Sequence, residues 1–134
     1  MNEAVLDASA LLAFLRNEPG GNKVAQELEN GAYMSAANWA EVLSKIFELG
    51  IDCEKLVSTL KMQGILGGAL IVEPFTENDG LLMGRLRLTT RKDGLSLGDC
   101  ACLALANKMK ARAITADRNW QNIKSATVKI EFIR

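Results

Sequence analysis

Four acidic residues stand within or at the ends of apolar segments of the chain: Asp7, Glu41, Asp99 and Asp117. Burying an unpaired charge is costly, so carboxylates in such places need a physical reason. Two carboxylates about 4 Å apart repel each other by roughly 4 kcal/mol at an effective dielectric constant near 20. If the four converge in space, a cation has to offset that repulsion. Mg²⁺ and Mn²⁺ prefer oxygen ligands, so the pattern predicts a site for one of these ions.

Histidine is absent from the 134 residues. Its absence excludes His-dependent catalytic triads, imidazole-based zinc enzymes and a histidine general base. The three cysteines are Cys53, Cys100 and Cys102, and no two of them form a C-x-x-C pair. Neither a zinc site nor a disulfide framework is therefore expected. We expect buried, reduced thiols, which fit a cytoplasmic protein.

Charge and hydropathy exclude other classes of protein. The 16 basic and 16 acidic residues give a net charge of zero, which argues against a broad nucleic-acid-coating surface but allows a local basic patch. No apolar stretch reaches the roughly 18 residues needed to span a membrane. The first residues, Met1-Asn2-Glu3, lack the basic start of a signal peptide. We expect no membrane association.

The pattern along residues 1–134 predicts a single domain in which strands and helices alternate. Strands are expected at residues 4–6, 32–34, 69–72, 113–115 and 128–132. Helices are expected at residues 8–15, 22–30, 35–49, from 52, at 76–88, from 96 and around 120, with a loop at 89–94. This order is typical of an α/β domain with a mainly parallel sheet, in which ligands bind beyond the carboxyl ends of the strands. Asp7 and Asp117 directly follow two of these strands, so we expect them at one site.

Each carboxylate also has a simpler interpretation. Asp7 and Asp117 could each cap the helix that follows. Residues 96–99, with Ser first and Asp last, match a capping box. Glu41 points away from the apolar face of its own helix and could form a surface pair with Lys45, four residues later.

Three segments of the chain resemble the motifs of the PIN domain, specifically those of VapC-type toxins of toxin–antitoxin systems. They are Val5-Leu6-Asp7-Ala8-Ser9-Ala10, Leu95-Ser96-Leu97-Gly98-Asp99-Cys100 and Ile114-Thr115-Ala116-Asp117. The helix of Glu41 supplies the fourth acid that this family has. The order and spacing of the motifs agree over essentially the whole chain.

The resemblance implies a three-layer α/β/α fold and an endoribonuclease that depends on Mg²⁺ or Mn²⁺. It gives catalytic and metal-binding roles to Asp7, Glu41, Asp99 and Asp117. Ser9 and Thr115 match hydroxyl positions near these acids. The resemblance also implies a homodimer that a small antitoxin protein neutralises. From its place on the helix, Asn38 is a candidate partner for Glu41.

Four basic residues precede the helix of Asp99 and could contact RNA phosphates: Arg85, Arg87, Arg91 and Lys92. The alternative is an ordinary solvated helix end.

Two other functions remain open from the sequence. One is a non-catalytic interaction module that keeps the PIN fold, and the other is a different Mg²⁺-dependent phosphohydrolase. A phosphatase of the haloacid-dehalogenase type would have a second Asp two residues after Asp7, where this chain has Ser9. A phosphoacceptor receiver would have an early acidic pair, which the sequence lacks.

Overall fold

A computed structural model describes residues 3–123 and 128–134. Its sheet has the strand order β3-β2-β1-β4-β5, and each neighbouring pair is parallel. The strands are β1 (Ala4–Leu6), β2 (Ala32–Ser35), β3 (Leu70–Glu73), β4 (Arg112–Thr115) and β5 (Ile130–Phe132). The predicted parallel α/β architecture is confirmed.

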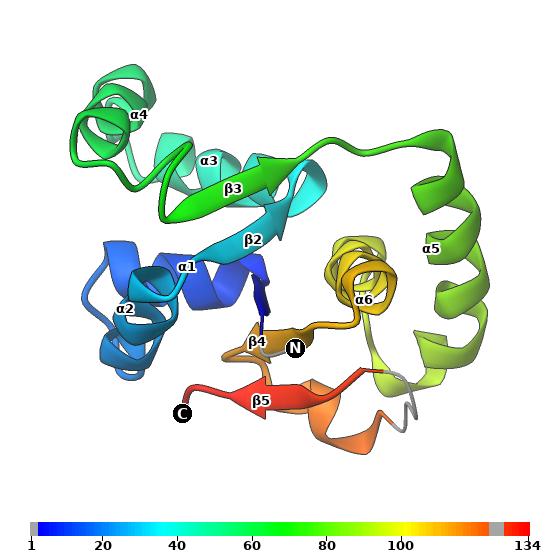
Figure 1. Cartoon of the computed structure of the whole chain (residues 1–134). Helices are drawn as coiled ribbons and strands as arrows, with labels where there is room; N and C mark the ends of the chain where they lie inside the picture. Colours follow the sequence, from blue (N-terminus) through cyan, green and yellow to red (C-terminus); the bar gives the residue numbers. More distant parts are fainter. Residues whose placement is uncertain (1–2, 124–127) are drawn as a thin grey trace.

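Helices cover both faces of this sheet. They are α1 (Ala8–Leu15), α2 (Gly21–Glu29), α3 (Ala36–Glu48), α4 (Cys53–Met62), α5 (Glu77–Thr90) and α6 (Leu97–Met109), with 3₁₀ turns η1 (Arg91–Asp93) and η2 (Arg118–Asn122). Figure 1 shows α1 and α2 on one side of the sheet and α6, with α5 outside it, on the other. The three-layer prediction is therefore confirmed. Among these helices none has the length and apolar character needed to cross a membrane.

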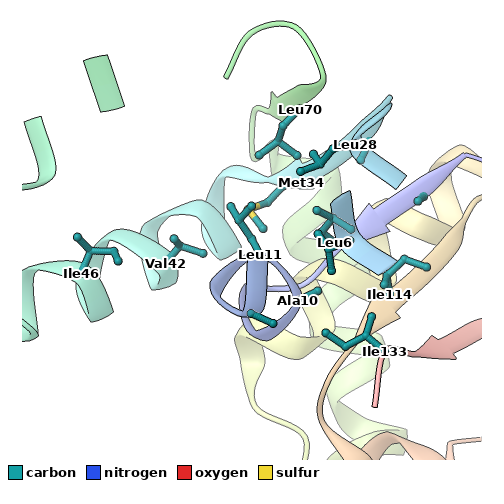
Figure 2. Close-up of a cluster of buried hydrophobic side chains, with 14 of the residues drawn as sticks. Leu6, Ala10, Leu11, Leu28, Met34, Val42, Ile46, Leu70, Ile114 and Ile133 are labelled. Carbon is teal, nitrogen blue, oxygen red and sulfur yellow. The ribbon is translucent and has the colours of Figure 1, made fainter. Parts of the chain in front are cut away.

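The strands alternate between two cores because successive side chains of a strand point to opposite faces. Leu6, Met34 and Ile114 contribute to the core beneath α1, α2 and α3, and Figure 2 shows them around Leu11. Val5 from β1, one residue away from Leu6, belongs instead to the core under α6. The short strands are thus fixed from both sides, which also fixes where each one ends.

Helix α6 is the central element of its layer. Residues 100–106 are all buried, as the apolar sequence of this segment predicts. One side packs on the sheet through Cys102 and Leu103, and the other packs against Met83 of α5 through Cys100 and Ala104. The N-terminus of α6, where Asp99 lies, is held in place by this burial.

Two boundaries differ from the prediction. Residues 89–94 are not a loop: α5 continues to Thr90 and η1 follows. The hydroxyl of Thr90 donates to the carbonyl oxygen of Leu86 at 2.9 Å, and its side chain is buried against Cys100. The polar composition of this segment suggests a loop, but packing against α6 keeps it helical as far as Thr90. The last strand is also shorter than predicted. It begins at Ile130 rather than at Val128, although Val128 is buried.

Candidate active site

The carboxyl ends of β1 and β4 lie side by side at the centre of the sheet. The strands pair with Leu6 opposite Ile114, and the backbone NH of Asp7 donates to the Ile114 carbonyl oxygen at 3.0 Å. This bond extends the pairing to Asp7, one residue beyond β1. The Asp7 side chain is 3% exposed, so a carboxylate lies almost fully buried at the sheet edge where ligands of α/β proteins bind.

Both oxygens of the Asp7 carboxylate accept hydrogen bonds. Oδ1 accepts from the Ser9 hydroxyl at 2.7 Å and from the backbone NH of Ala10 at 2.8 Å. Oδ2 accepts from the Thr115 hydroxyl at 2.5 Å. Asp7 is thus the N-cap of α1, as the simpler interpretation has it, and it is also joined to the neighbouring strand.

The two hydroxyls connect Asp7 to the segment that follows β4. Ser9 Oγ accepts from the backbone NH of Ala116 at 2.9 Å, and Thr115 Oγ1 accepts from the backbone NH of Asp117 at 3.0 Å. Asp117 in turn caps η2, since its Oδ1 accepts from the backbone NH of Asn119 at 2.9 Å. The hydrogen bonds of Ser9 and Thr115 therefore fix the position of Asp117 relative to Asp7.

Asp99 forms the predicted capping box at the start of α6. Its Oδ2 accepts from the backbone NH of Ser96 at 2.9 Å, and its own NH donates to Ser96 Oγ at 3.1 Å. Capping does not exclude a second role, because a carboxylate has more acceptor positions than one such bond uses.

Glu41 is not in the surface pair that its helix suggested. Lys45 pairs with Glu48 at 3.6 Å instead. The Glu41 carboxylate accepts from Asn38 Nδ2 at 2.7 Å, and it lies against Gly98, the residue before Asp99. Glu41 is exposed as a residue, but its carboxylate end lies against the N-terminus of α6.

Burial and mutual repulsion raise the pKa values of three of the four acids. Burial raises the pKa of Asp7 to about 6, although the bonds from Thr115, Ser9 and Ala10 act in the opposite direction. The charge of Asp99 raises the pKa of Asp7 further.

Asp99 connects the set electrostatically. Burial, and then the charge of Asp99, raise the pKa of Glu41. Burial is also the main cause that raises the pKa of Asp99, with a contribution from the charge of Asp117. The structure thus brings the other three acids within electrostatic reach of Asp99.

The thiol of Cys102 lies within reach of the same charges. Burial raises its pKa well above the usual range, and the charges of Asp7, Asp99 and Glu41 raise it further. These surroundings disfavour the thiolate, which is the form of cysteine that binds metals and acts as a nucleophile. Cys53, Cys100 and Cys102 are all free and buried, as predicted.

The donor set fits a hydrated hard cation. Within residues 3–123 and 128–134, no three carboxylates or thiols are placed to grip one ion together. Mg²⁺ does not require that, because it keeps several waters and usually takes one or two carboxylates directly. The carboxylates at this buried edge of the sheet repel one another, and a cation that prefers oxygen ligands offsets that repulsion.

The four basic residues do not share one environment. Arg85, Arg91 and Lys92 are exposed and can reach a polyanion. Arg87 is half-buried, and its Nη1 is shielded from solvent with no hydrogen-bond partner in the described part of the chain. Burial raises the pKa of Cys100 on α6, and the charge of Arg87 acts in the opposite direction, which places the guanidinium toward α6. Arg87 therefore fits an RNA contact less well than the other three.

Sequence reasoning missed Gly98. A Cβ atom built on this glycine would lie 2.6 Å from Oε2 of Glu41. The available signal was a glycine in the first turn of a helix, where Ala is favoured by about 1 kcal/mol.

Comparison with known proteins identifies the fold family. The family model described as the PIN domain matches residues 4–126. No curated protein matches the chain. Among solved structures, VapBC-1 from nontypeable Haemophilus influenzae has 21% identity and a TM-score of 0.69, and the match covers 98% of each chain. FitAcB from Neisseria gonorrhoeae has 20% identity and a TM-score of 0.67, with 97% of each chain covered. A toxin–antitoxin complex from Klebsiella pneumoniae has 17% identity and a TM-score of 0.67, covering 93% of this chain and 94% of the other.

Proposed function

The chain belongs to the PIN domain family, and from this premise we propose that it is a metal-dependent endoribonuclease, the toxin of a toxin–antitoxin pair. One observation supports the catalytic part most strongly. A buried carboxylate, Asp7, sits at the carboxyl edge of the sheet in the electrostatic field of a second acid, Asp99. Stability alone does not favour such a pair, whereas a bound cation makes it favourable.

In this proposal Asp7 and Asp99 contact Mg²⁺ or Mn²⁺ most directly. Glu41 and Asp117 would hold its waters or a second ion. When bound, the ion lowers the pKa of a coordinated water and offsets the negative charge that develops at phosphorus.

The chain's own residues orient these acids. The hydroxyls of Ser9 and Thr115 hold the Asp7 carboxylate in one orientation and favour its charged form. Thr115 also fixes the backbone of Asp117. The site is therefore organised before the substrate arrives, which reduces the reorganisation needed during the reaction.

RNA has to approach this acidic site against repulsion. We infer that the exposed side chains of Arg85, Arg91 and Lys92, on α5 and η1, contact its phosphates. Arg91 and Lys92 precede α6 by a few residues in the sequence, and Asp99 lies at the start of that helix.

The partners in this proposal are a small antitoxin and a second copy of the chain, in the cytoplasm. The similar structures from Haemophilus influenzae and Klebsiella pneumoniae are described as VapBC-1 and as a toxin–antitoxin complex. Several large apolar side chains are exposed on α3 to α5, among them Phe47, Met62, Leu81 and Leu88. These side chains supply apolar surface that a protein partner could cover.

Purified protein incubated with a panel of structured RNAs tests the proposal, with Mn²⁺, with Mg²⁺ and with chelator. Cleavage that needs the metal supports the nuclease. A metal-induced rise in melting temperature without cleavage points to a different phosphohydrolase or to a substrate outside the panel. Neither cleavage nor a thermal shift would favour the non-catalytic interaction module.

A further inference from the structure

Asn38 joins α3 to the N-terminus of α6. Its side chain is 1% exposed, and its Nδ2 donates both hydrogens: to Glu41 Oε1 at 2.7 Å and to the carbonyl oxygen of Gly98 at 2.9 Å. Both acceptors lack a hydrogen to donate, so the amide nitrogen has to face them. One side chain therefore ties a site carboxylate to the backbone next to Asp99.

We propose that Asn38 and Gly98 form a positioning clamp that fixes the Glu41 carboxylate relative to Asp99. The clamp deepens the proposed nuclease function and rests on it. Neither residue touches the substrate in this account; both act through Glu41.

Gly98 supplies the space that the clamp needs. A Cβ atom at this position would lie 2.6 to 2.7 Å from three atoms of the Glu41 carboxyl group. The φ angle does not require glycine here, since Gly98 is not among the glycines with positive φ. A side chain could be accommodated only if the Glu41 carboxylate moved, which would break its bond to Asn38. The glycine is thus explained by the position of Glu41.

The carbonyl of the Asn38 amide shows that stability alone does not account for this residue. Its Oδ1 is buried and accepts no hydrogen bond from any described residue. A buried acceptor without a partner destabilises the folded state, a cost that an apolar side chain of similar size would avoid. An unsatisfied group in a native structure calls for an explanation, and a role at the site provides one.

The clamp restricts a side chain that is otherwise free to move. Glu41 lies on a face of α3 that is open toward Ser44 and Lys45. Without the amide, the carboxylate could rotate into this open groove, away from α6. With the Asn38 amide in place, its two hydrogen bonds fix the position of Glu41 relative to the N-terminus of α6, and therefore relative to Asp99.

The first test uses the side-chain amide signals of Asn38 in a nitrogen–proton NMR spectrum, without metal or RNA. We expect Glu41→Gln and Gly98→Ala each to shift these signals. Gly84→Ala is the matched control, because Gly84 is also helical and a Cβ there meets nothing within 4 Å. Signals that stay unchanged in both Glu41→Gln and Gly98→Ala would overturn the clamp.

The second test measures Mn²⁺ affinity by electron paramagnetic resonance, with Mn²⁺ alone as the probe, together with the cleavage rate. Groups that orient metal ligands typically contribute 10–100-fold to affinity or activity. We expect Asn38→Ala and Gly98→Ala to lower one of the two by about 10-fold, again with Gly84→Ala unchanged. In a Glu41→Gln background, Asn38→Ala should have no further effect. Additive losses would mean that Asn38 does not act through Glu41, and would overturn the proposal.

The two tests separate this inference from the function it rests on. If the wild-type protein neither binds Mn²⁺ nor cleaves RNA, the proposed nuclease function fails. Shifted amide signals would then still support the clamp geometry, whereas unchanged signals would overturn it whatever the cleavage assay gives.

Discussion

Thr115 donates its hydroxyl hydrogen to Asp7 across 2.5 Å, and this bond joins the carboxyl ends of β1 and β4. The two residues are 108 positions apart in the chain. The same hydroxyl accepts from the backbone NH of Asp117. A single side chain thus orients one acid, favours its charged form and fixes the backbone of another.

Thr115→Val should raise the pKa of Asp7 above its value of about 6, because Val keeps the shape but removes the donor. A hydrogen bond to a charged group contributes about 1.5 kcal/mol or more, which corresponds to about one pH unit. If Asp7 has to be ionised, the acid limb of the pH–rate profile moves to higher pH by that amount. Thr90→Val is the control, since it removes a buried hydroxyl from α5 instead. An acid limb at the same pH in Thr115→Val would contradict this role of the bond.

Asp7→Asn should stabilise the fold at neutral pH. Burial raises the pKa of Asp7 from 3.8 to about 6, so the folded state binds the proton more tightly than the unfolded state. The contribution of Asp7 to stability is therefore fully present below pH ~4 and is lost as pH rises through about 6. Replacing the carboxylate should increase the free energy of unfolding by about 2–3 kcal/mol at neutral pH and change it little below pH ~4.

Urea unfolding at the two pH values, with chelator present, measures this difference. Mg²⁺ should reduce the advantage of the variant, because the ion stabilises only the charged wild type. A variant less stable than the wild type at neutral pH would show that the hydrogen bonds of Asp7 outweigh its desolvation.

Arg112 should stabilise the fold without contributing to the site. It lies at the opposite end of β4 from Thr115, where its guanidinium binds Glu27 through two bonds of 2.7 and 2.8 Å and Glu131 at 2.9 Å. Removal of one partner from such a half-buried network costs about 2 kcal/mol. We expect Arg112→Ala to lower the free energy of unfolding by that amount and to leave the cleavage rate per folded molecule unchanged.

Lys129→Ala is the matched control for Arg112→Ala. Lys129 approaches the same Glu131 at 3.4 Å, but its side chain is 74% exposed. Exposed ion pairs contribute little, so the change in free energy should stay within about 0.5 kcal/mol. Equal losses in the two variants would show that exposure does not decide the strength of these pairs.

Arg91→Ala and Lys92→Ala should each weaken RNA binding, because each removes a contact to an RNA phosphate. Each lost contact to single-stranded RNA should reduce the slope of log affinity against log salt concentration by about 0.7. Lys61→Ala, an exposed cation on α4, is the control and should leave the slope unchanged. A slope that is the same in all three variants would remove Arg91 and Lys92 from the RNA-binding surface.

Local sequence signals predicted how two of the candidate site residues are held. Asp7 and Asp99 both stand at helix starts that obey capping rules, and the apolar segment around Cys102 predicted a fully buried helix. These features depend on neighbours within a few residues, so the sequence carries them directly.

The position of Glu41 could not be predicted in the same way. A helical projection shows which side of α3 is polar, but not which distant element will cover that side. A surface pair with Lys45 is the local expectation for this helix, and it is wrong: Lys45 pairs with Glu48, and Gly98, 57 positions after Glu41, leaves room for the Glu41 carboxylate. The helical end of α5 was missed for a related reason, since Thr90 is buried by α6.

RNA cleavage by the wild type is compared with cleavage by Asp7→Asn and Asp99→Asn, in Mn²⁺ and at equal concentrations of folded protein. We expect metal-dependent cleavage by the wild type and a loss of at least about 100-fold in both variants, although Asp7→Asn should be at least as stable as the wild type. Wild-type cleavage rates in either folded variant would contradict the claim that these two acids form the active site.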